Sequence, residues 1–179
     1  MENDMNFSVI KKYDIANGPG CRTTLFVSGC RNHCEGCFQP ETWNFSYGQP
    51  YTEDIQEEIL DSLSEDYVAG LTLLGGDPFE EENQQVLTPL LEALRARFGC
   101  KKDVWAYTGY IYEKDLPQGC RKHTVFTDRM LGCIDVLVDG PFIIARKDIS
   151  LRFCGSSNQR LLDMKKTLAS GVPVRLAAV

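Results

Sequence analysis

The chain lacks a hydrophobic segment near its start, where residues 1–6 carry two acids and no apolar run. This absence excludes a signal peptide or a membrane span there, so we expect a cytoplasmic protein. The chain also lacks an excess of positive charge, since its formal net charge is -6. Because nonspecific binding to phosphate depends on Lys and Arg, this charge argues against nucleic acid as the main partner and leaves a protein partner open.

Neither a repeat nor a low-complexity segment interrupts the chain, and 43% hydrophobic and 25% charged residues are ordinary for a globular protein. A length of 179 residues suits one sizeable core, so we predict a single domain over residues 1–179. The eight cysteines do not indicate a disulfide framework, because the cytoplasmic thiol pool keeps most cysteines reduced. Ligands of a metal cluster, together with small buried residues, explain them better.

Three of these cysteines, Cys30, Cys34 and Cys37, form the pattern C-x3-C-x2-C directly after residues 24–27, which read as a buried strand. One irregular loop can turn three sulfurs at this spacing toward a common centre. Thiolates are the usual ligands of iron-sulfur clusters, and a cluster of four irons normally takes four of them. Three leave one iron without a protein ligand, and an open metal position keeps a site reactive.

The alternative from the same residues is a structural zinc site in a noncatalytic binding module, with His33 or a distant cysteine as the fourth ligand. The chain has no second C-x2-C pair to complete such a site. His33 and Cys34 are also adjacent, so the two side chains do not easily point at one small ion. We therefore favour the iron-sulfur cluster.

Apolar periodicity predicts strands and helices in alternation. Core strands are predicted over residues 24–27, 71–74, 103–107 and 134–138. Helices are predicted over residues 52–63 and 84–98, with a threonine cap at the first start and a glycine after the second end. One or two more strands are predicted, near residues 6–13, where residues 7–10 alternate as in a short strand, and near residues 172–176. One short helix is predicted within residues 111–129. This order predicts an α/β fold, an incomplete parallel β/α barrel.

Small or polar residues follow these strands: Gly75, Gly76 and Asp77 after the second, Thr108 after the third, and Asp139 after the fourth. In parallel α/β folds, ligands gather at the carboxyl ends of the strands. The two glycines have no side chain and let a ligand come close to the backbone. Asp139 is a candidate for contact with a ligand or a cation, and a turn-forming Asp before Gly-Pro explains it equally well.

The cysteine pattern followed by Gly75-Gly76-Asp77-Pro78 resembles the radical S-adenosylmethionine (radical SAM) superfamily. The resemblance implies that the three cysteines hold one 4Fe-4S cluster and that the methionine part of SAM chelates the unique iron. The glycine segment is similar to the G-G-E-P motif that hydrogen-bonds the methionine amino group. A side chain at Gly76 is then expected to weaken SAM binding and to leave iron binding intact. The implied contacts with SAM include Gly36, Cys37, Phe38 beside the adenine, Asp77, Thr108 and Asp139.

Three further segments resemble the glycyl-radical-activating enzymes. Residues 17–22 are similar to their D-G-P-G-x-R loop, with Asn17 where an acid is more usual. Residues 39–43 resemble N-P-E-T-W, with Gln39 in the first place. Residues 152–160 resemble R-F-x-G-S-S-N-Q-R, the C-terminal signature of the proteins that activate anaerobic ribonucleoside-triphosphate reductase.

This resemblance implies that SAM is cleaved to methionine and a 5′-deoxyadenosyl radical, which takes a hydrogen from a glycine of the large reductase subunit. It also implies a flavodoxin- or ferredoxin-like electron donor, and an open flank of the barrel where the glycine loop enters. An activase of another glycyl radical enzyme, such as pyruvate formate-lyase, is the alternative with the same chemistry. Many activases for other substrates insert a cysteine-rich segment after the first cluster, whereas this chain has no cysteine between Cys37 and Gly75.

A last helix is expected from a capping box formed by Ser156 and Gln159, with Leu161, Met164 and Leu168 along one face. The start of such a helix would suit an anion.

Four other expectations concern single residues. Trp43 is expected in the core. Arg22 belongs either to a functional loop or to a plain turn that leaves it solvated. Cys21 precedes a strand long enough to hold it far from Cys30, so we expect that it is not a ligand. No role is assigned to Cys100, Cys120, Cys133 and Cys154.

Overall fold

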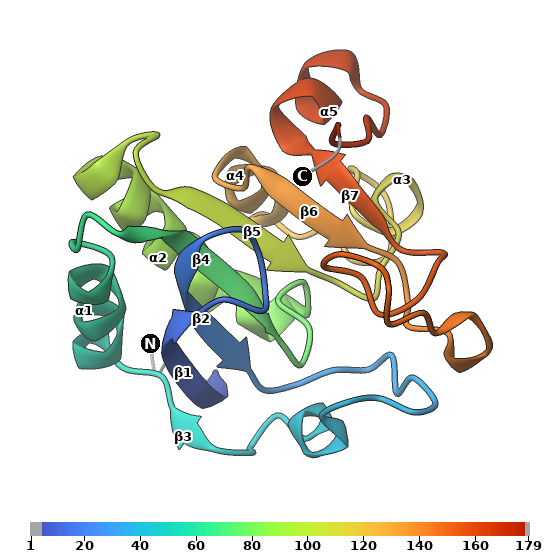
Figure 1. The fold of residues 1–179 in the computed structure, drawn as a ribbon, viewed down its shortest axis with the longest axis horizontal. Helices are drawn as coiled ribbons and strands as arrows, with labels where there is room; N and C mark the ends of the chain where they lie inside the picture. Colours follow the sequence, from blue (N-terminus) through green and yellow to red (C-terminus); the bar gives the residue numbers. More distant parts are fainter. Residues whose placement is uncertain (1–4, 178–179) are drawn as a thin grey trace.

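The computed structural model describes residues 5–177, which form one seven-stranded sheet in the order β3-β1-β2-β4-β5-β6-β7 (Figure 1). The four neighbours β2, β4, β5 and β6 are parallel, whereas β1 and β3 at one side and β7 at the other are antiparallel to their partners. The strands are β1 (Asn6–Asp14), β2 (Cys21–Val27), β3 (Gln49–Pro50), β4 (Val68–Gly75), β5 (Asp103–Tyr107), β6 (Val136–Asp139) and β7 (Arg160–Asp163). The predicted parallel sheet of an incomplete barrel is confirmed.

Within residues 5–177, four helices lie in the connections between the parallel strands and a fifth follows β7. They are α1 (Glu53–Ser62), α2 (Glu81–Phe98), α3 (Tyr112–Asp115), α4 (Thr127–Gly132) and α5 (Met164–Ser170), with two 3₁₀ turns, η1 (Pro40–Trp43) and η2 (Ile144–Arg146). The Thr52 hydroxyl accepts a hydrogen bond from the Ile55 N–H (3.3 Å), which explains where α1 begins. α2 begins at Glu81 rather than at the predicted residue 84, and two short helices occupy the region where one was allowed.

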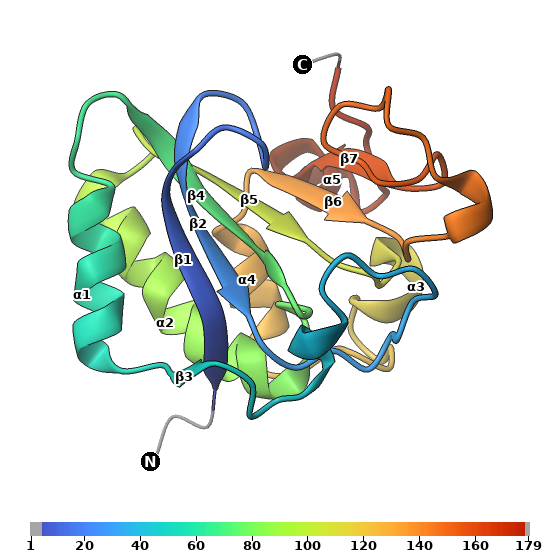
Figure 2. The ribbon, with the colours of Figure 1, turned by 60° about the horizontal axis from the view of Figure 1, so that its bottom comes forward.

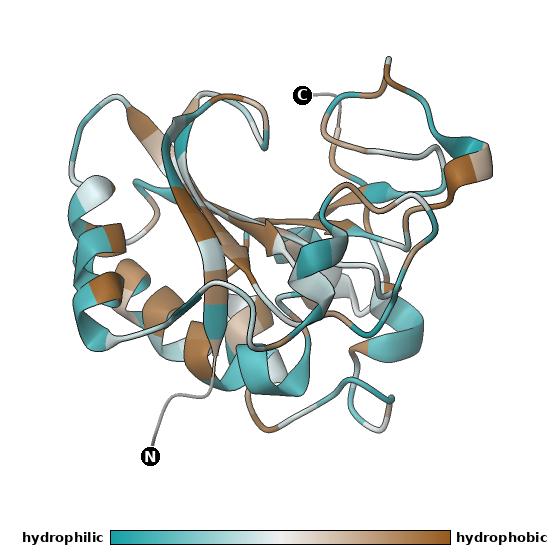
Figure 3. Cartoon of the chain, turned by 90° about the horizontal axis from the view of Figure 1, so that it is seen from below, coloured by the Kyte–Doolittle hydropathy of each residue, from teal (hydrophilic) through white to brown (hydrophobic). Residues whose placement is uncertain are grey.

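Alternation along the strands separates two faces of the sheet. Leu71 and Leu73 are fully buried in the main core, which α1, α2 and α4 complete on one side of the sheet (Figure 2). Trp105 and Val138 point to the other face, where they form a second apolar cluster. The strands are mostly brown and α1 and α2 carry both colours, as two-sided strands and amphipathic helices require (Figure 3). The helix-free face is left for a ligand.

The predicted helix over residues 156–168 is wrong in its first half. The Gln159 side-chain oxygen accepts hydrogen bonds from the N–H groups of Gly155 (2.8 Å) and Ser156 (3.2 Å), but a strand follows. Leu161 pairs with Val138 in the sheet, and α5 begins only at Met164. The predicted anion site at that helix start therefore does not form. A local S-x-x-Q pattern stabilises a turn as well as it stabilises the start of a helix. Here the residues after the turn pair with β6 and form β7 instead of a helix.

Both outer edges of the sheet are short or covered. β3 has two residues, of which Pro50 has no N–H to donate. Beside β7, the Asp163 N–H donates to Val174 O (2.9 Å) and the Leu176 N–H to Leu161 O (2.8 Å). The strand predicted near residues 172–176 is thus reduced to one bridge, between Leu162 and Arg175. Within residues 5–177, no helix is both long and apolar enough to cross a membrane.

Candidate functional site

The predicted site residues come together around one cavity of about 370 Å³ at the carboxyl ends of the parallel strands. The residues that both the sequence predicted and the cavity contains are Cys30, Cys34, Cys37, Phe38, Gly75, Gly76, Asp77 and Thr108. They come from the ends of three neighbouring strands, β2, β4 and β5, as a ligand site of a parallel sheet requires.

The cysteine loop leaves β2 at Val27 and is held by backbone hydrogen bonds. The Gly29 N–H donates to Thr42 O (2.8 Å) and the Cys30 N–H to Trp43 O (3.3 Å). Further along, the Cys37 N–H donates to Cys34 O (3.1 Å), which closes a tight turn between the last two thiols. The P-E-T-W segment thus supports the cysteine loop through its main chain.

The glycine segment after β4 contacts the cysteine loop directly. The Gly76 N–H donates to Val27 O (2.6 Å), and the Asp77 N–H donates to Gly29 O (2.8 Å). A Cβ on Gly76 would lie less than 3.0 Å from Gly29 O, and one on Gly75, whose φ is +110°, would lie 2.6 Å from Val27 O. Both glycines are therefore required for contact between two loops of the protein itself, which is a different reason from space for a ligand.

Asp77 is buried on the floor of the cavity with its carboxylate fully engaged. It accepts hydrogen bonds from the Phe79 and Gly109 N–H groups (both 2.9 Å), the Asn32 amide (2.9 Å) and the Thr108 hydroxyl (2.9 and 3.1 Å). Burial raises the pKa of Asp77 to about 7, while the hydrogen bonds from Phe79, Gly109 and Thr108 oppose this rise. Thr108 therefore acts on the site by holding this carboxylate.

Two of the thiols, those of Cys30 and Cys34, lie in a setting that disfavours free thiolates. Burial, followed by the nearby carboxylate of Asp77, raises the pKa of the Cys30 thiol to about 12, and burial also raises the pKa of Cys34. Metal binding deprotonates such thiols, because the ion supplies the positive charge that the protein does not.

The donor set fits a 4Fe-4S cluster. Among residues 5–177, no group of three or more His, Cys, Asp or Glu side chains is arranged to hold a single metal ion. A cubane places each cysteine on a different iron, so it requires three thiols around one space, which this cavity provides.

Two predicted residues, Asp139 and Gly36, differ from expectation in their surroundings. Asp139 is fully buried, pairs with Arg160 and accepts the Tyr112 N–H (2.9 Å), so its carboxylate already has partners within the chain. It does not line the cavity, and its proposed contact with SAM or a cation gains no support. Gly36 turns the cysteine loop with φ +72°, against Ile144, and does not line the cavity either.

The structure corrects the prediction for Trp43 and decides between the two alternatives for Arg22. Trp43 is not a core residue: it is half-buried, lines the cavity and stacks on His33 with ring centroids 4.6 Å apart. Arg22 is not solvated either, because it is fully buried and donates to Thr72 Oγ1 (2.7 Å) and Leu71 O (3.0 Å). The arginine of the N-G-P-G-x-R loop thus fixes that loop to β4.

Sequence reasoning missed the residues that support the site. Asn32, inside the cysteine loop, orients Asp77, and Asn17 lines the cavity from the N-G-P-G loop. Glu80 accepts four hydrogen bonds next to the cysteine loop. The only sequence signal for Glu80 is its place three residues after Asp77, which does not by itself distinguish it from a solvated acid.

Cys21 lies at the opposite end of β2 from the cysteine loop, paired with Val68, in keeping with a residue that is not a ligand. Cys154 packs in the second apolar cluster with Trp105 and Phe153. All eight cysteines have free thiols in the structure.

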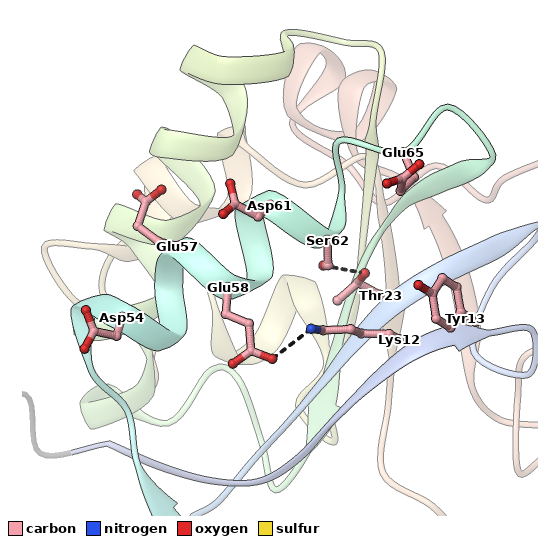
Figure 4. Close-up of a pocket in the computed structure, with 9 residues that line it drawn as sticks. All are labelled: Lys12, Tyr13, Thr23, Asp54, Glu57, Glu58, Asp61, Ser62 and Glu65. Atoms are coloured by element: carbon pink, nitrogen blue, oxygen red, sulfur yellow. Dashed lines mark hydrogen bonds and ion pairs between the residues drawn. The ribbon is translucent and has the colours of Figure 1, made fainter.

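A second, larger cavity of about 530 Å³ lies between β1 and α1 (Figure 4). Its walls carry five acids and no cysteine. Two contacts cross it, the ion pair of Lys12 with Glu58 (2.9 Å) and the hydrogen bond between the hydroxyls of Thr23 and Ser62 (2.8 Å). None of the residues that line it belongs to the cysteine loop.

Three thiols and a glycine segment around one cavity, at the strand ends of a partial barrel, define a radical SAM protein with a single cluster. In agreement, residues 16–162 match the family model of a 4Fe-4S single cluster domain. The chain is 40% identical over 159 residues to the anaerobic ribonucleoside-triphosphate reductase-activating protein of Enterobacteria phage T4, covering 88% of this chain and 93% of that protein. It is 39% identical over 159 residues to the proteins of the same name from Escherichia coli K12 and Vibrio cholerae, covering 87% of this chain and 96% of each of them. The chain belongs to the family of anaerobic ribonucleoside-triphosphate reductase-activating proteins.

Proposed function

We propose that this chain activates an anaerobic ribonucleoside-triphosphate reductase by reductive cleavage of SAM at one 4Fe-4S cluster, which generates a glycyl radical on the reductase. The observation that carries this proposal is the shared cavity of Cys30, Cys34 and Cys37 with Gly75 and Gly76. The relatives named above carry this activity in their names.

In this proposal Cys30, Cys34 and Cys37 hold the cluster. When bound and reduced, the cluster supplies the electron that cleaves SAM to methionine and a 5′-deoxyadenosyl radical. The chain binds and orients SAM through the main chain of Gly75 and Gly76, with Asp77 held in place by its neighbours. Phe38, 68% exposed at the rim, offers a flat apolar surface to the adenine.

The reductase completes the site by covering it. The cavity is bounded by protein on the sides of β2, β4 and β5, and exposed residues such as Phe38 form its rim. A glycine loop that enters there excludes water at the moment of contact and protects the radical from side reactions. An interface that forms for one reaction and then separates is expected to be small and partly polar.

The cysteine assignment is tested by changing single cysteines to serine and measuring iron and sulfide after anaerobic reconstitution. Cys34→Ser is expected to lose the 4Fe-4S cluster. Cys154→Ser and Cys21→Ser are the matched controls, since both thiols lie away from the cavity. Equal loss of iron in a control and in Cys34→Ser would overturn the assignment.

The activity is tested by incubating the reductase from the same organism with this protein, SAM and a reductant. A glycyl doublet in the electron paramagnetic resonance (EPR) spectrum that requires all three components supports the proposal. Normal formation of 5′-deoxyadenosine without a radical on the reductase, but with one on pyruvate formate-lyase, would make the alternative partner correct.

The electron donor, a flavodoxin- or ferredoxin-like protein, belongs to the same proposal. A single domain over residues 1–179, a cytoplasmic location and the absence of nucleic acid among the partners stay predictions.

A further inference from the structure

Glu80 is a carboxylate with no exposed surface that joins three segments of the chain beside the cysteine loop. One oxygen accepts hydrogen bonds from the Arg31 N–H (2.8 Å) and the Tyr110 hydroxyl (2.6 Å). The other accepts from Arg31 Nη1 and Lys122 Nζ (both 2.7 Å). Each oxygen thus has two donors, and a carboxylate is the only side-chain group that satisfies all four.

The peptide between Cys30 and Arg31 is fixed by this arrangement. Its N–H is the first main-chain donor after Cys30, and Glu80 is its acceptor. The Arg31 side chain is held as well, because it also donates to Glu82 (3.0 and 2.6 Å) and lies over the Phe45 ring, 4.3 Å from the centroid. The residue that follows the first thiol therefore has neither a free main chain nor a free side chain.

The arrangement also places charge beside the thiol. Burial would raise the pKa of Glu80, but hydrogen bonds from Lys122, Tyr110 and Arg31 hold it below its usual range, so the group is ionised. Its negative charge lies beside the peptide that follows Cys30. The positive charge of Arg31 is paired with it, since Arg31 Nη1 lies 2.7 Å from a Glu80 carboxylate oxygen.

We infer that Glu80 is a positioning residue of the cluster site: it fixes the peptide after Cys30, and the Glu80–Arg31 pair sets the local charge against which the cluster is reduced. The inference rests on the proposed function in one respect, the assignment of Cys30 as a ligand. Glu80 lies outside the motifs that identified the site, and Arg31 stands at a position that the C-x3-C-x2-C pattern leaves unspecified.

The test is the midpoint potential of the reconstituted cluster, followed by EPR, in variants that remove one charge at a time. Glu80→Gln removes a negative charge and is expected to shift the equilibrium for one-electron reduction roughly tenfold toward the reduced cluster. Arg31→Gln removes a positive charge and is expected to shift it in the opposite direction. Glu92→Gln is the matched control, because Glu92 is a carboxylate of α2, the helix that Glu80 immediately precedes, and it accepts two hydrogen bonds from Arg129 (2.8 and 2.7 Å) at the surface.

Midpoint potentials that shift in opposite directions in Glu80→Gln and Arg31→Gln, with no shift in Glu92→Gln, support the inference. Disturbed packing alone gives no reason for the direction of the shift to follow the sign of the charge that is removed. Shifts of the same sign, or no shift in either, overturn it. A Gln at position 80 leaves two donors without an acceptor, so Glu80→Gln can fail to assemble a cluster. In that case the test depends on Arg31→Gln, whose side chain is half-exposed, and an unchanged midpoint potential in this variant overturns the inference. Full cluster content in Cys30→Ser would instead refute the proposed ligand assignment.

Discussion

Replacing Gly76 by alanine is expected to damage iron binding as well as SAM binding. The sequence alone predicted that a side chain here would affect SAM only. In the structure, the new Cβ would lie less than 3.0 Å from the Gly29 carbonyl oxygen, immediately before Cys30. Because Gly29 O is a main-chain atom and a Cβ is fixed rigidly to the main chain of residue 76, the cysteine loop and the glycine segment have to move apart.

The size of the effect follows from two contributions. Overpacking of a tight contact costs about 1–3 kcal/mol. Separation of the loops also weakens the hydrogen bonds from the Gly76 N–H to Val27 O and from the Asp77 N–H to Gly29 O, each worth about 1 kcal/mol. Together they predict a loss of about 2–5 kcal/mol in the free energy of unfolding. At a urea dependence of about 2 kcal/mol per molar, the urea midpoint falls by about 1–2.5 M.

Urea unfolding of the cluster-free protein measures the first effect, and iron per chain after anaerobic reconstitution measures the second. Gly132→Ala is the matched control, because Gly132 ends α4 and a Cβ there meets no atom within 4 Å. It is expected to leave iron binding unchanged and stability equal or slightly higher. If the free energy of unfolding of Gly76→Ala lies within about 0.5 kcal/mol of the wild-type value and the variant binds a full complement of iron, the close contact between the two loops is not required for stability or iron binding.

Three further predictions use the same assays. Arg22→Met should lower the free energy of unfolding by about 3 kcal/mol, because it leaves Thr72 and Leu71 O without their buried donor; a loss under about 1 kcal/mol contradicts this. Thr108→Val should weaken SAM binding and leave iron content unchanged, since it removes a hydrogen bond to Asp77 on the cavity floor; SAM affinity measured anaerobically decides. The pKa of Glu80 lies below its unfolded value of 4.5, so its contribution is present above that pH and is lost on acidification. The urea midpoint of the wild type should therefore fall more steeply below pH 4.5 than that of Glu80→Gln.

The parts of the fold that depend on local pattern were predictable from the sequence. The apolar residues 25–27 of β2 and 104–106 of β5 mark buried strands, and α1 has its own cap at Thr52. The convergence of Cys30, Gly75 and Thr108 also followed, because parallel strands bring their carboxyl ends to one edge of the sheet.

The rest depended on contacts between distant segments. Leu161 has the spacing of a helix, but strand pairing with Val138 fixed it in the sheet. Nothing in the sequence near Arg22 indicates that β4 supplies acceptors for it some fifty residues away. Gly76 was understood as space for a ligand, whereas the nearest atoms to its missing side chain are those of Gly29. Patterns located the site, and only the packing of loops explained why its residues are required.

The blunted edges of the sheet bear on how the protein behaves before it acquires iron. An open sheet exposes rows of unpaired backbone groups that can join sheets of different molecules into aggregates. Here β3 is reduced to Gln49–Pro50, and residues 174–176 hydrogen-bond along β7. Aggregation of the cluster-free chain is therefore expected to begin at exposed apolar loop residues such as Ile149, which is 94% exposed, rather than by strand addition.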